Sequence, residues 1–273
     1  MTTFDNKTLY LASRELYAST DNGINWEKIN GIPKSSDVRS AQFNSKGWLY
    51  VLTRYDGIFY TKDLKNWQAI NNGILNKSDP TDFMVKDDMM MVGYPFDGIY
   101  ISTDNGGFWQ KVIVSGDSQY FKLFNRHADG TLYIFDDNWK VYRSQDIGKS
   151  WRPLKLDLGF DLTMPQGFAI CNDGNLYIGS NESIISQVSP LTLKGASQRY
   201  FDLNSSARSV SNISAYKDDI LYLVRFAPKS GVYSKNNNWG RLELGFSKDI
   251  YAYYAKTDGN FLLVGEEGLF YKN

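Results

Sequence analysis

The chain has 273 residues, which is enough for one large all-β domain or two domains of average size. Hydrophobic residues make up 42% of the composition and charged residues 22%, which is typical of a folded protein rather than a disordered one. Thirty acidic residues balance thirty lysines and arginines, so no overall electrostatic field attracts nucleic acid or an anionic membrane.

The same composition offers little material for metal or triad chemistry. Cys171 is the only cysteine, which excludes an internal disulfide framework and a cysteine-based zinc site. His127 is the only histidine and lies in a polar turn, where an ordinary surface role is expected. No apolar stretch reaches the roughly 18 residues of a membrane helix, and the first ten residues lack the features of a signal peptide. We therefore expect no metal, no cofactor, no nucleic-acid partner and no membrane insertion.

In chain order, the sequence falls into seven similar units. Each unit contains an apolar pair in a predicted strand: Leu9-Tyr10, Leu49-Tyr50, Met90-Met91, Leu132-Tyr133, Leu176-Tyr177, Leu221-Tyr222 and Leu262-Leu263. A hydroxyl residue follows the first six pairs, at Ser19, Thr61, Ser102, Ser144, Ser186 and Ser234, with successive spacings of 42, 41, 42, 42 and 48 residues. The units lie near residues 1–30, 38–70, 82–113, 120–156, 166–203, 208–244 and 249–273.

Each unit is predicted to form short strands separated by turns. The second unit shows the pattern with VRSAQFNS, WLYVLT, GIFYT and WQAI, and the first with TTF, TLYLA, ELYAS and WEKI. Four antiparallel strands at this period are typical of a β-propeller blade. The sequence therefore predicts an all-β fold, a single β-propeller over residues 1–273 with seven four-stranded blades, or six as the alternative.

Two units depart from the pattern. The last unit supplies IYAYYAK, FLLVGE and GLFYK but no fourth strand. A strand from the N-terminus, a three-stranded blade or a segment from outside this chain would each account for the difference. The third alternative would make the chain part of a larger protein or complex. The fifth unit lacks the signature described next, and we interpret it as a decayed repeat, with a contact surface at this edge as the alternative.

A short signature is predicted to form the hairpin between the third and fourth strands. Full copies read STDNGINW, STDNGGFW and SQDIGKSW, and shortened copies read TKDLKNW and SKNNNW. Its residues are Ser19, Asp21, Gly23, Trp26, Thr61, Asp63, Trp67, Ser102, Asp104, Gly106, Trp109, Ser144, Asp146, Gly148, Trp151, Ser234 and Trp239.

Turn chemistry explains each position of the signature. The hydroxyl and carboxylate bond the backbone of the turn, the glycine takes a positive φ, and the tryptophan packs across the hairpin base while its N–H finds a carbonyl. One carboxylate in DNGINW is too few for a calcium loop. We therefore interpret the signature as structural.

The pattern Ser/Thr-x-Asp-x-Gly-x-x-Trp resembles the Asp-box, or BNR, repeat. Three copies match it fully, TKDLKNW is one residue short and SKNNNW is two residues short, so the resemblance covers nearly the whole chain. Members of that superfamily include sialidases, some endoglucanases, sortilin-like sorting receptors and photosystem assembly factors. The resemblance implies a propeller of six to eight blades with the boxes on the rim away from the ligand face. It also favours a secreted or extracytoplasmic location.

The opposite face is predicted to be built from the loops between second and third strands and from the segments joining successive units. Loops carried by a rigid scaffold are common binding sites. The candidate ligand-binding residues on these loops and on the first strands are Arg14, Arg39, Arg54, Tyr55, Asp56, Tyr94, Phe96, Asp97, Asp136, Asp137, Trp139, Arg208, Arg225 and Phe226. Arginines mixed with carboxylates and aromatic rings suit a glycan or a protein partner.

Three functions remain open from the sequence. The first is a non-catalytic ligand-binding or protein-interaction propeller, with a glycan as one ligand. The second is a glycoside hydrolase, for which Asp56, Asp97, Asp136, Asp137 or Glu182 would supply a carboxyl pair. Against it, the chain lacks the Arg-Ile-Pro motif and the Tyr-Glu pair that a sialidase resemblance implies. The third is an assembly factor of the photosystem type, a special case of the first.

Overall fold

The computed structural model describes residues 2–5, 7–33, 37–114, 120–156, 165–171, 174–180, 184–189, 195–199, 210–216, 219–224, 231–234, 236–237, 240–242, 250–255, 261–265 and 268–272. These residues form 26 strands in seven antiparallel sheets, and the described part of the chain contains no helix. Contacts divide the chain into two compact units, residues 1–124 with 131–152 and residues 125–130 with 153–273.

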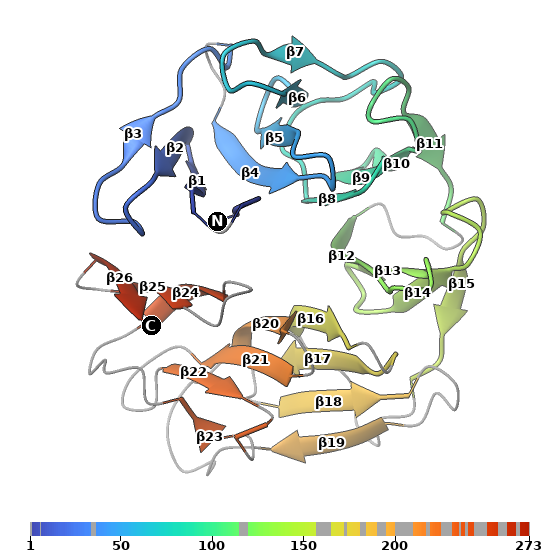
Figure 1. The fold of residues 1–273 in the computed structure, drawn as a ribbon. Helices are drawn as coiled ribbons and strands as arrows, with labels where there is room; N and C mark the ends of the chain where they lie inside the picture. Colours follow the sequence, from blue (N-terminus) through green and yellow to red (C-terminus); the bar gives the residue numbers. More distant parts are fainter. Residues whose placement is uncertain are drawn as a thin grey trace. The chain divides into compact units, whose positions relative to one another are not determined.

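The first three sheets lie within the first unit, and the fourth has residues in both units. Sheet 1 comprises β1 (Leu9–Ser13), β2 (Glu15–Ser19) and β3 (Glu27–Lys28), and sheet 2 comprises β4 (Val38–Phe43), β5 (Leu49–Thr53), β6 (Ile58–Thr61) and β7 (Gln68–Ala69). Sheet 3 comprises β8 (Asp82–Lys86), β9 (Met89–Tyr94), β10 (Gly98–Ser102) and β11 (Gln110–Val112). Sheet 4 comprises β12 (Phe121–Arg126), β13 (Leu132–Asp136), β14 (Val141–Ser144) and β15 (Arg152–Leu154). Figure 1 shows the strands of each sheet in sequence order.

Three more sheets lie within the second unit. Sheet 5 comprises β16 (Pro165–Ile170), β17 (Leu176–Ser180), β18 (Ile184–Val188) and β19 (Gly195–Arg199). Sheet 6 comprises β20 (Val210–Tyr216), β21 (Asp219–Val224), β22 (Gly231–Ser234) and β23 (Gly240–Arg241). Sheet 7 comprises β24 (Ile250–Ala255), β25 (Phe261–Gly265) and β26 (Gly268–Lys272).

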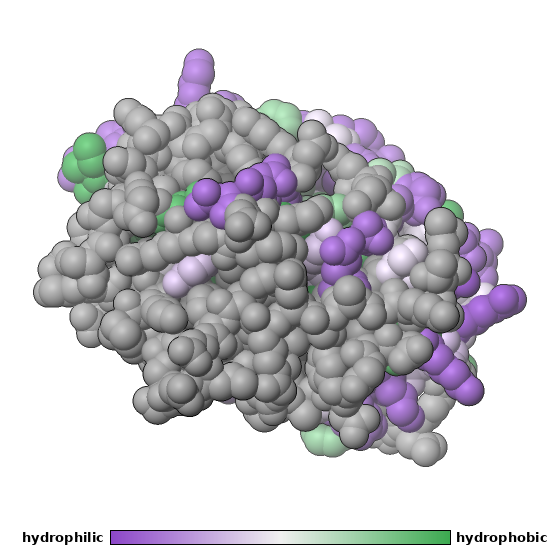
Figure 2. Space-filling view, turned by 90° about the horizontal axis from the view of Figure 1, so that it is seen from below, coloured by the Kyte–Doolittle hydropathy of each residue, from purple (hydrophilic) through white to green (hydrophobic). Residues whose placement is uncertain are grey.

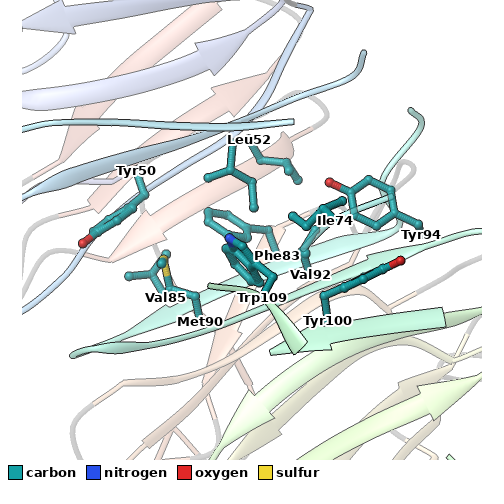
Figure 3. Close-up of a cluster of buried hydrophobic side chains, with 11 residues drawn as sticks. Tyr50, Leu52, Ile74, Phe83, Val85, Met90, Val92, Tyr94, Tyr100 and Trp109 are labelled. Atoms are coloured by element: carbon teal, nitrogen blue, oxygen red, sulfur yellow. The ribbon is translucent and has the colours of Figure 1, made fainter. Parts of the chain in front are cut away.

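In both units, hydrophobic clusters lie between neighbouring sheets. In β9, Met90, Val92 and Tyr94 pack in the cluster shared with sheet 2, whereas Met89 and Met91 pack in the cluster shared with sheet 4. Side chains alternate between the two faces of a strand, so a strand covered on both faces is apolar throughout. Figure 3 shows the first of these clusters, with Trp109 among side chains of both sheets. Sheets that pack face to face in sequence order are the blades of a β-propeller.

The expectation of seven four-stranded blades is wrong, and so is the alternative of six. Five sheets have four strands, and sheets 1 and 7 have three. The predicted strand TTF is reduced to an isolated bridge between Thr2 and Tyr10. The chain turns directly afterwards, because the Asp5 carboxylate accepts hydrogen bonds from the backbone N–H groups of Lys7 and Thr8. In sheet 7, β26 is the third and last described strand.

The described side chains on one face of the molecule (Figure 2) are mainly polar. Figure 2 shows mostly hydrophilic side chains among the coloured atoms on the face that it views, with a few hydrophobic ones between them. None of the described residues belongs to a helix that is long and apolar enough to span a membrane.

Candidate binding site

Three hairpins with a full signature, here called the box hairpins (residues 19–26, 102–109 and 144–151), share one hydrogen-bond pattern. In the first, the Ser19 hydroxyl donates to Asp21 Oδ1 at 2.8 Å and accepts the backbone N–H of Gly23 at 2.8 Å. Asp21 Oδ1 also accepts the N–H of Asn25 at 2.9 Å. These hydrogen bonds to the Asn25 backbone and the Ser19 hydroxyl lower the pKa of Asp21 to about 2. The carboxylate therefore serves the turn itself.

The sixth repeat builds the same arrangement from a different residue. Its signature, SKNNNW, lacks the aspartate of the full copies. Asp219, at the start of β21, supplies the carboxylate instead and accepts the Ser234 hydroxyl at 2.5 Å and the Asn236 N–H at 2.8 Å. Spacing within the signature gave no indication of this replacement, because Asp219 lies 15 residues before Ser234.

Two tryptophans of the signature copies, Trp67 and Trp109, each form a hydrogen bond to the sheet that precedes their own. The indole N–H of Trp67 donates to the Asn30 carbonyl at 3.3 Å, and that of Trp109 donates to the Ile70 carbonyl at 2.6 Å. Among the tryptophans with a described indole hydrogen bond, Trp26 is the exception. Its indole N–H donates to the Gly23 carbonyl of its own loop at 2.9 Å. Trp109 is 1% exposed, so its ring belongs to the core between sheets 2 and 3. Trp151 is also buried, and Trp239 lies outside the described residues.

At the other end of the strands, backbone hydrogen bonds join the loop of one sheet to the segment that leads into the next sheet. The Arg14 carbonyl accepts the Val38 N–H at 2.7 Å, and the Arg54 carbonyl accepts the Asp79 N–H at 2.7 Å. The Arg54 N–H also donates to the Asp37 carbonyl at 2.8 Å. These bonds bring the predicted loops and joining segments of the first three sheets together.

A chain of ion pairs runs through the same place. Arg54 Nε lies 2.5 Å from Asp79 Oδ1, and Arg54 Nη1 lies 3.9 Å from Asp37 Oδ2. Arg39 Nη2 lies 3.1 Å from the same Asp37 oxygen. The hydrogen bond that Arg54 donates to the Asp79 carboxylate raises the pKa of Arg54. Exposed pairs of this kind add little stability, so their main effect is to hold the guanidinium groups in place.

Arg39 occupies a bulge at the start of β4. The pairing of β4 with β5 shifts register between Val38 and Ser40, which leaves Arg39 as the extra residue. Similar shifts occur near the start of β16, β20 and β24. Bulges bend a strand and redirect a side chain, and they are frequent beside binding sites.

An open cavity of about 540 Å³ adjoins Arg39. Arg39, Ser40, Asp79, Thr81 and Asp82 supply polar groups to its wall, and Leu52, Pro80, Phe83, Pro95 and Tyr120 supply apolar and aromatic surface. Asp82 accepts the N–H groups of Phe83 at 2.8 Å and Phe124 at 2.7 Å. The volume lies in the range of small-molecule sites, and the wall of this cavity is more polar than the mainly apolar wall that is usual for such sites.

The structure places the predicted binding residues in different settings. Arg39 lines the cavity and is linked through Asp37 to Arg54, whose guanidinium carbon lies 5.1 Å from the centre of the Tyr55 ring. Arg14, Asp56 and Asp137 are at least partly exposed in their loops, and Phe96 is 85% exposed. Trp139 is half-buried, with the Lys122 ammonium 4.2 Å from its ring centre. Arg208, Arg225 and Phe226 lie outside the described residues.

The expectation of a ligand-facing position is wrong for Tyr94 and Asp136. Tyr94 is fully buried and packs edge-on against Tyr100, with ring centres 6.1 Å apart. Asp136 is 1% exposed and accepts hydrogen bonds from the backbone of Asn138 and Lys140 and from the Tyr142 hydroxyl. Asp97 is 17% exposed and pairs with Lys111 at 2.6 Å. Asp136 and Asp97 thus organise their own loops, whereas Tyr94 belongs to the core between sheets 2 and 3.

Sequence reasoning did not single out Asp37, Asp79, Asp82 or Tyr120. The first three lie in or directly after the joining segments NGIPKSSD and NNGILNKSDPT, and no signature marks them. Metal chemistry has no setting in the described residues, since they contain no group of three or more His, Cys, Asp or Glu side chains that would hold an ion.

No protein-family model matches the chain. The chain is 29% identical over 159 residues to xyloglucanase Xgh74A of Acetivibrio thermocellus, a match that covers 54% of this chain and only 16% of the enzyme. Among solved structures, it is similar to YCF48 bound to D1 peptide, with a TM-score of 0.73, 14% identity and coverage of 98% of this chain and 90% of the other. It is also similar to the extracellular domain of the putative hybrid two component system BT4673 from B. thetaiotaomicron, with a TM-score of 0.78, 11% identity and coverage of 100% and 40%. At these identities the structural likeness shows the fold, which is that of a β-propeller.

Proposed function

We propose that this β-propeller is a non-catalytic binding protein that holds a neutral glycan in the cavity beside Arg39. The observation that carries the proposal is the composition of the cavity wall. Carboxylates, a guanidinium and hydroxyls suit the many hydroxyl groups of a sugar, and the exposed Tyr120 ring suits its apolar faces. The partial likeness to a xyloglucanase makes xyloglucan oligosaccharides the first ligands to test.

The surroundings of the two cavity carboxylates, Asp79 and Asp82, favour binding over hydrolysis. A glycosidase needs a carboxylic acid with a raised pKa, which usually requires an apolar surrounding. The Asp79 side chain is 54% exposed and accepts a hydrogen bond from Arg54, and Asp82 accepts two backbone N–H groups. Neither carboxylate therefore lies in the apolar surrounding that a general acid of this kind needs.

Calorimetric titration with xyloglucan oligosaccharides, run beside an assay for reducing sugar, tests the proposal. We expect binding without sugar release. Arg39→Ala should weaken binding about tenfold to a hundredfold, because it removes a charged hydrogen-bond donor from the cavity. Arg152→Ala, at an exposed arginine of β15, is the matched control and should bind as the wild type does.

Three results would contradict this proposal. Sugar release would make the chain a hydrolase. Unchanged affinity in Arg39→Ala would place the ligand elsewhere on the molecule. Failure of the wild type to bind any glycan of a broad array would exclude the ligand class.

A further inference from the structure

A second, smaller pocket of about 200 Å³ opens beside the shortened signature copy TKDLKNW of sheet 2. Its wall comes from the end of β6, the hairpin that follows and the start of β7, and consists of Tyr60, Thr61, Lys62, Asp63, Asn66 and Gln68. The volume is below that of sites for drug-sized molecules, so the pocket suits a single small ring.

This pocket and the cavity beside Arg39 lie at opposite ends of the strands. Thr61 pairs with Leu49 at one end of β5, whereas Val38, next to Arg39, pairs with Thr53 at the other end. The two have no lining residue in common. A ligand of the smaller pocket would therefore bind independently of the glycan proposed above.

Aromatic rings support the smaller pocket from below. The Tyr60 ring contacts those of Trp48 and Tyr50, and its centre lies 5.8 Å from the centre of each. Tyr50 is fully buried in the core between sheets 2 and 3, where Figure 3 shows it, whereas Trp48 and Tyr60 are half-buried. Because the stack is anchored in the core, the accessible part of the Tyr60 ring is held in one orientation. A fixed aromatic ring suits the apolar face of a sugar.

Lys62 brings an unpaired cation to the wall. Its ammonium lies 3.9 Å from the centre of the Trp48 ring, and this cation–π interaction holds the side chain in place. Lys46 also approaches that ring, at 5.6 Å, but its ammonium pairs with Asp88 at 2.8 Å. Lys62, in contrast, forms no ion pair with any residue that the structure describes. Its charge is therefore available to an anionic ligand.

The wall contains one carboxylate, that of Asp63, and the hairpin already uses both of its oxygens. Asp63 Oδ1 accepts the backbone N–H groups of Lys65 at 2.9 Å and Asn66 at 2.8 Å, and Oδ2 accepts the Asn66 side-chain amide at 2.7 Å. Hydrogen bonds from the Asn66 backbone and side chain are the main cause of the lowered pKa of Asp63. Asp63 thus serves the turn and does not pair with Lys62.

Gln68 supplies a further hydrogen-bond donor. The Tyr60 hydroxyl donates to Gln68 Oε1 at 2.9 Å, while the amide nitrogen of Gln68 has no partner among the described residues. An ionised carboxylate only accepts hydrogen bonds, so an ammonium beside an amide nitrogen suits it, and sugar hydroxyls can use the Asn66 and Tyr60 oxygens. We infer that this pocket binds a hexuronate residue of an acidic glycan, with its carboxylate at Lys62 and its ring against Tyr60.

Calorimetric titration of the whole chain with oligosaccharides of galacturonic acid and of glucuronic acid tests this inference. The methyl esters of the same oligosaccharides are the matched neutral ligands, and we expect them to bind about tenfold more weakly than the acids. Lys62→Ala should weaken binding of the acids about tenfold to a hundredfold, because it removes a charged hydrogen-bond donor. Lys65→Ala is the matched control, since Lys65 is an exposed lysine of the same hairpin that does not line the pocket. Gln68→Ala, at an exposed position, is a second test variant, and thermal unfolding checks that all three are folded.

Loss of affinity in Lys62→Ala and Gln68→Ala, with wild-type affinity in Lys65→Ala, would support the inference. Failure of the wild type to bind either acid, or equal affinity for the acids and their esters, would overturn it. Equal losses in Lys62→Ala and Lys65→Ala would also overturn it, because they would indicate diffuse attraction by surface charge. Equally tight binding of a glutamate-rich peptide would exclude a site for sugars.

Reciprocal titrations separate this inference from the proposed function. Arg39→Ala should bind the acids as the wild type does, and Lys62→Ala should bind xyloglucan oligosaccharides as the wild type does. Loss of hexuronate binding in Arg39→Ala would place the acid in the larger cavity and overturn the inference.

Discussion

Single residues in the box hairpins carry backbone strain that differs between repeats. The residue before the box glycine is left-handed in all three full copies, with φ of 60° at Asn22, 60° at Asn105 and 61° at Ile147. Asparagine tolerates this conformation, whereas a β-branched residue does not. We predict that Ile147→Asn raises the free energy of unfolding by about 1 kcal/mol, since Ile147 is 54% exposed and loses little burial. Urea denaturation measures the change.

Ile24→Asn is the control for that prediction. Ile24 is 77% exposed in the first box hairpin and is not left-handed. An exposed substitution without relief of strain should change the free energy of unfolding by less than about 0.5 kcal/mol. Equal effects of the two substitutions would show that strain at residue 147 is not the cause.

The aspartates of the box hairpins make the free energy of unfolding depend on pH. Hydrogen bonds from the Ser150 side chain and backbone and from Ser144 lower the pKa of Asp146 from an ordinary 3.8 to about 2. A carboxyl with a lowered pKa in the folded state stabilises the protein above its ordinary pKa, and this contribution is lost as the pH falls through the folded value. We predict that the stability advantage of wild type over Asp146→Asn is constant above about pH 5 and shrinks between about pH 4 and pH 2.

Urea denaturation at closely spaced pH values checks this dependence. Asp137→Asn, at an exposed carboxylate outside the boxes, is the matched control. A difference between wild type and Asp146→Asn that does not change down to pH 2 would mean that the carboxylate form has no special role in the turn.

At the scale of whole elements, the turn that follows β7 packs directly against the residue that precedes β11 in the next sheet. Gly73 has a φ of 98°, and a Cβ built there would lie 2.1 Å from the Trp109 carbonyl oxygen. We predict that Gly73→Ala lowers the free energy of unfolding by at least about 3 kcal/mol, because backbone strain adds to a clash with backbone. Gly98→Ala is the control: its φ is 90°, but the nearest atom lies 3.9 Å away, so a loss of about 1–2 kcal/mol is expected. Thermal unfolding of both variants checks the difference, and equal losses would exclude the contact.

Strands were predictable from the sequence because their periodicity is local. WLYVLT contains β5, and alternation along β9 also explains why Tyr94 is buried, since it shares a face with Met90 and Val92. Treating Tyr94 as a loop residue overlooked that alternation. By contrast, the partner of the Trp109 indole lies 39 residues away, and Asp219 replaces a box aspartate from another strand. Such contacts depend on how strands and sheets pack, which spacing does not encode.

At the scale of the whole molecule, stability is built from contacts between successive sheets. Separate core clusters join sheets 1 and 2, sheets 2 and 3, and sheets 3 and 4, and another joins sheets 5 and 6. In arrays of this kind, stability is approximately a sum of terms from each repeat and from each interface between neighbours. A defect at one interface should therefore act mainly on the two sheets that share it.

Trp109→Ala tests this locality, because Trp109 is buried in the cluster between sheets 2 and 3 and bonds the Ile70 carbonyl. Truncation of a buried tryptophan should cost about 3–5 kcal/mol. We predict that amide hydrogen exchange rises most in β4–β11 and least in β16–β23, measured by mass spectrometry on the native chain. The Phe108→Ala variant, at the exposed neighbour of Trp109, should leave exchange unchanged. A uniform rise over all seven sheets would instead show that the repeats open as one cooperative unit, with coupling that reaches beyond adjacent sheets.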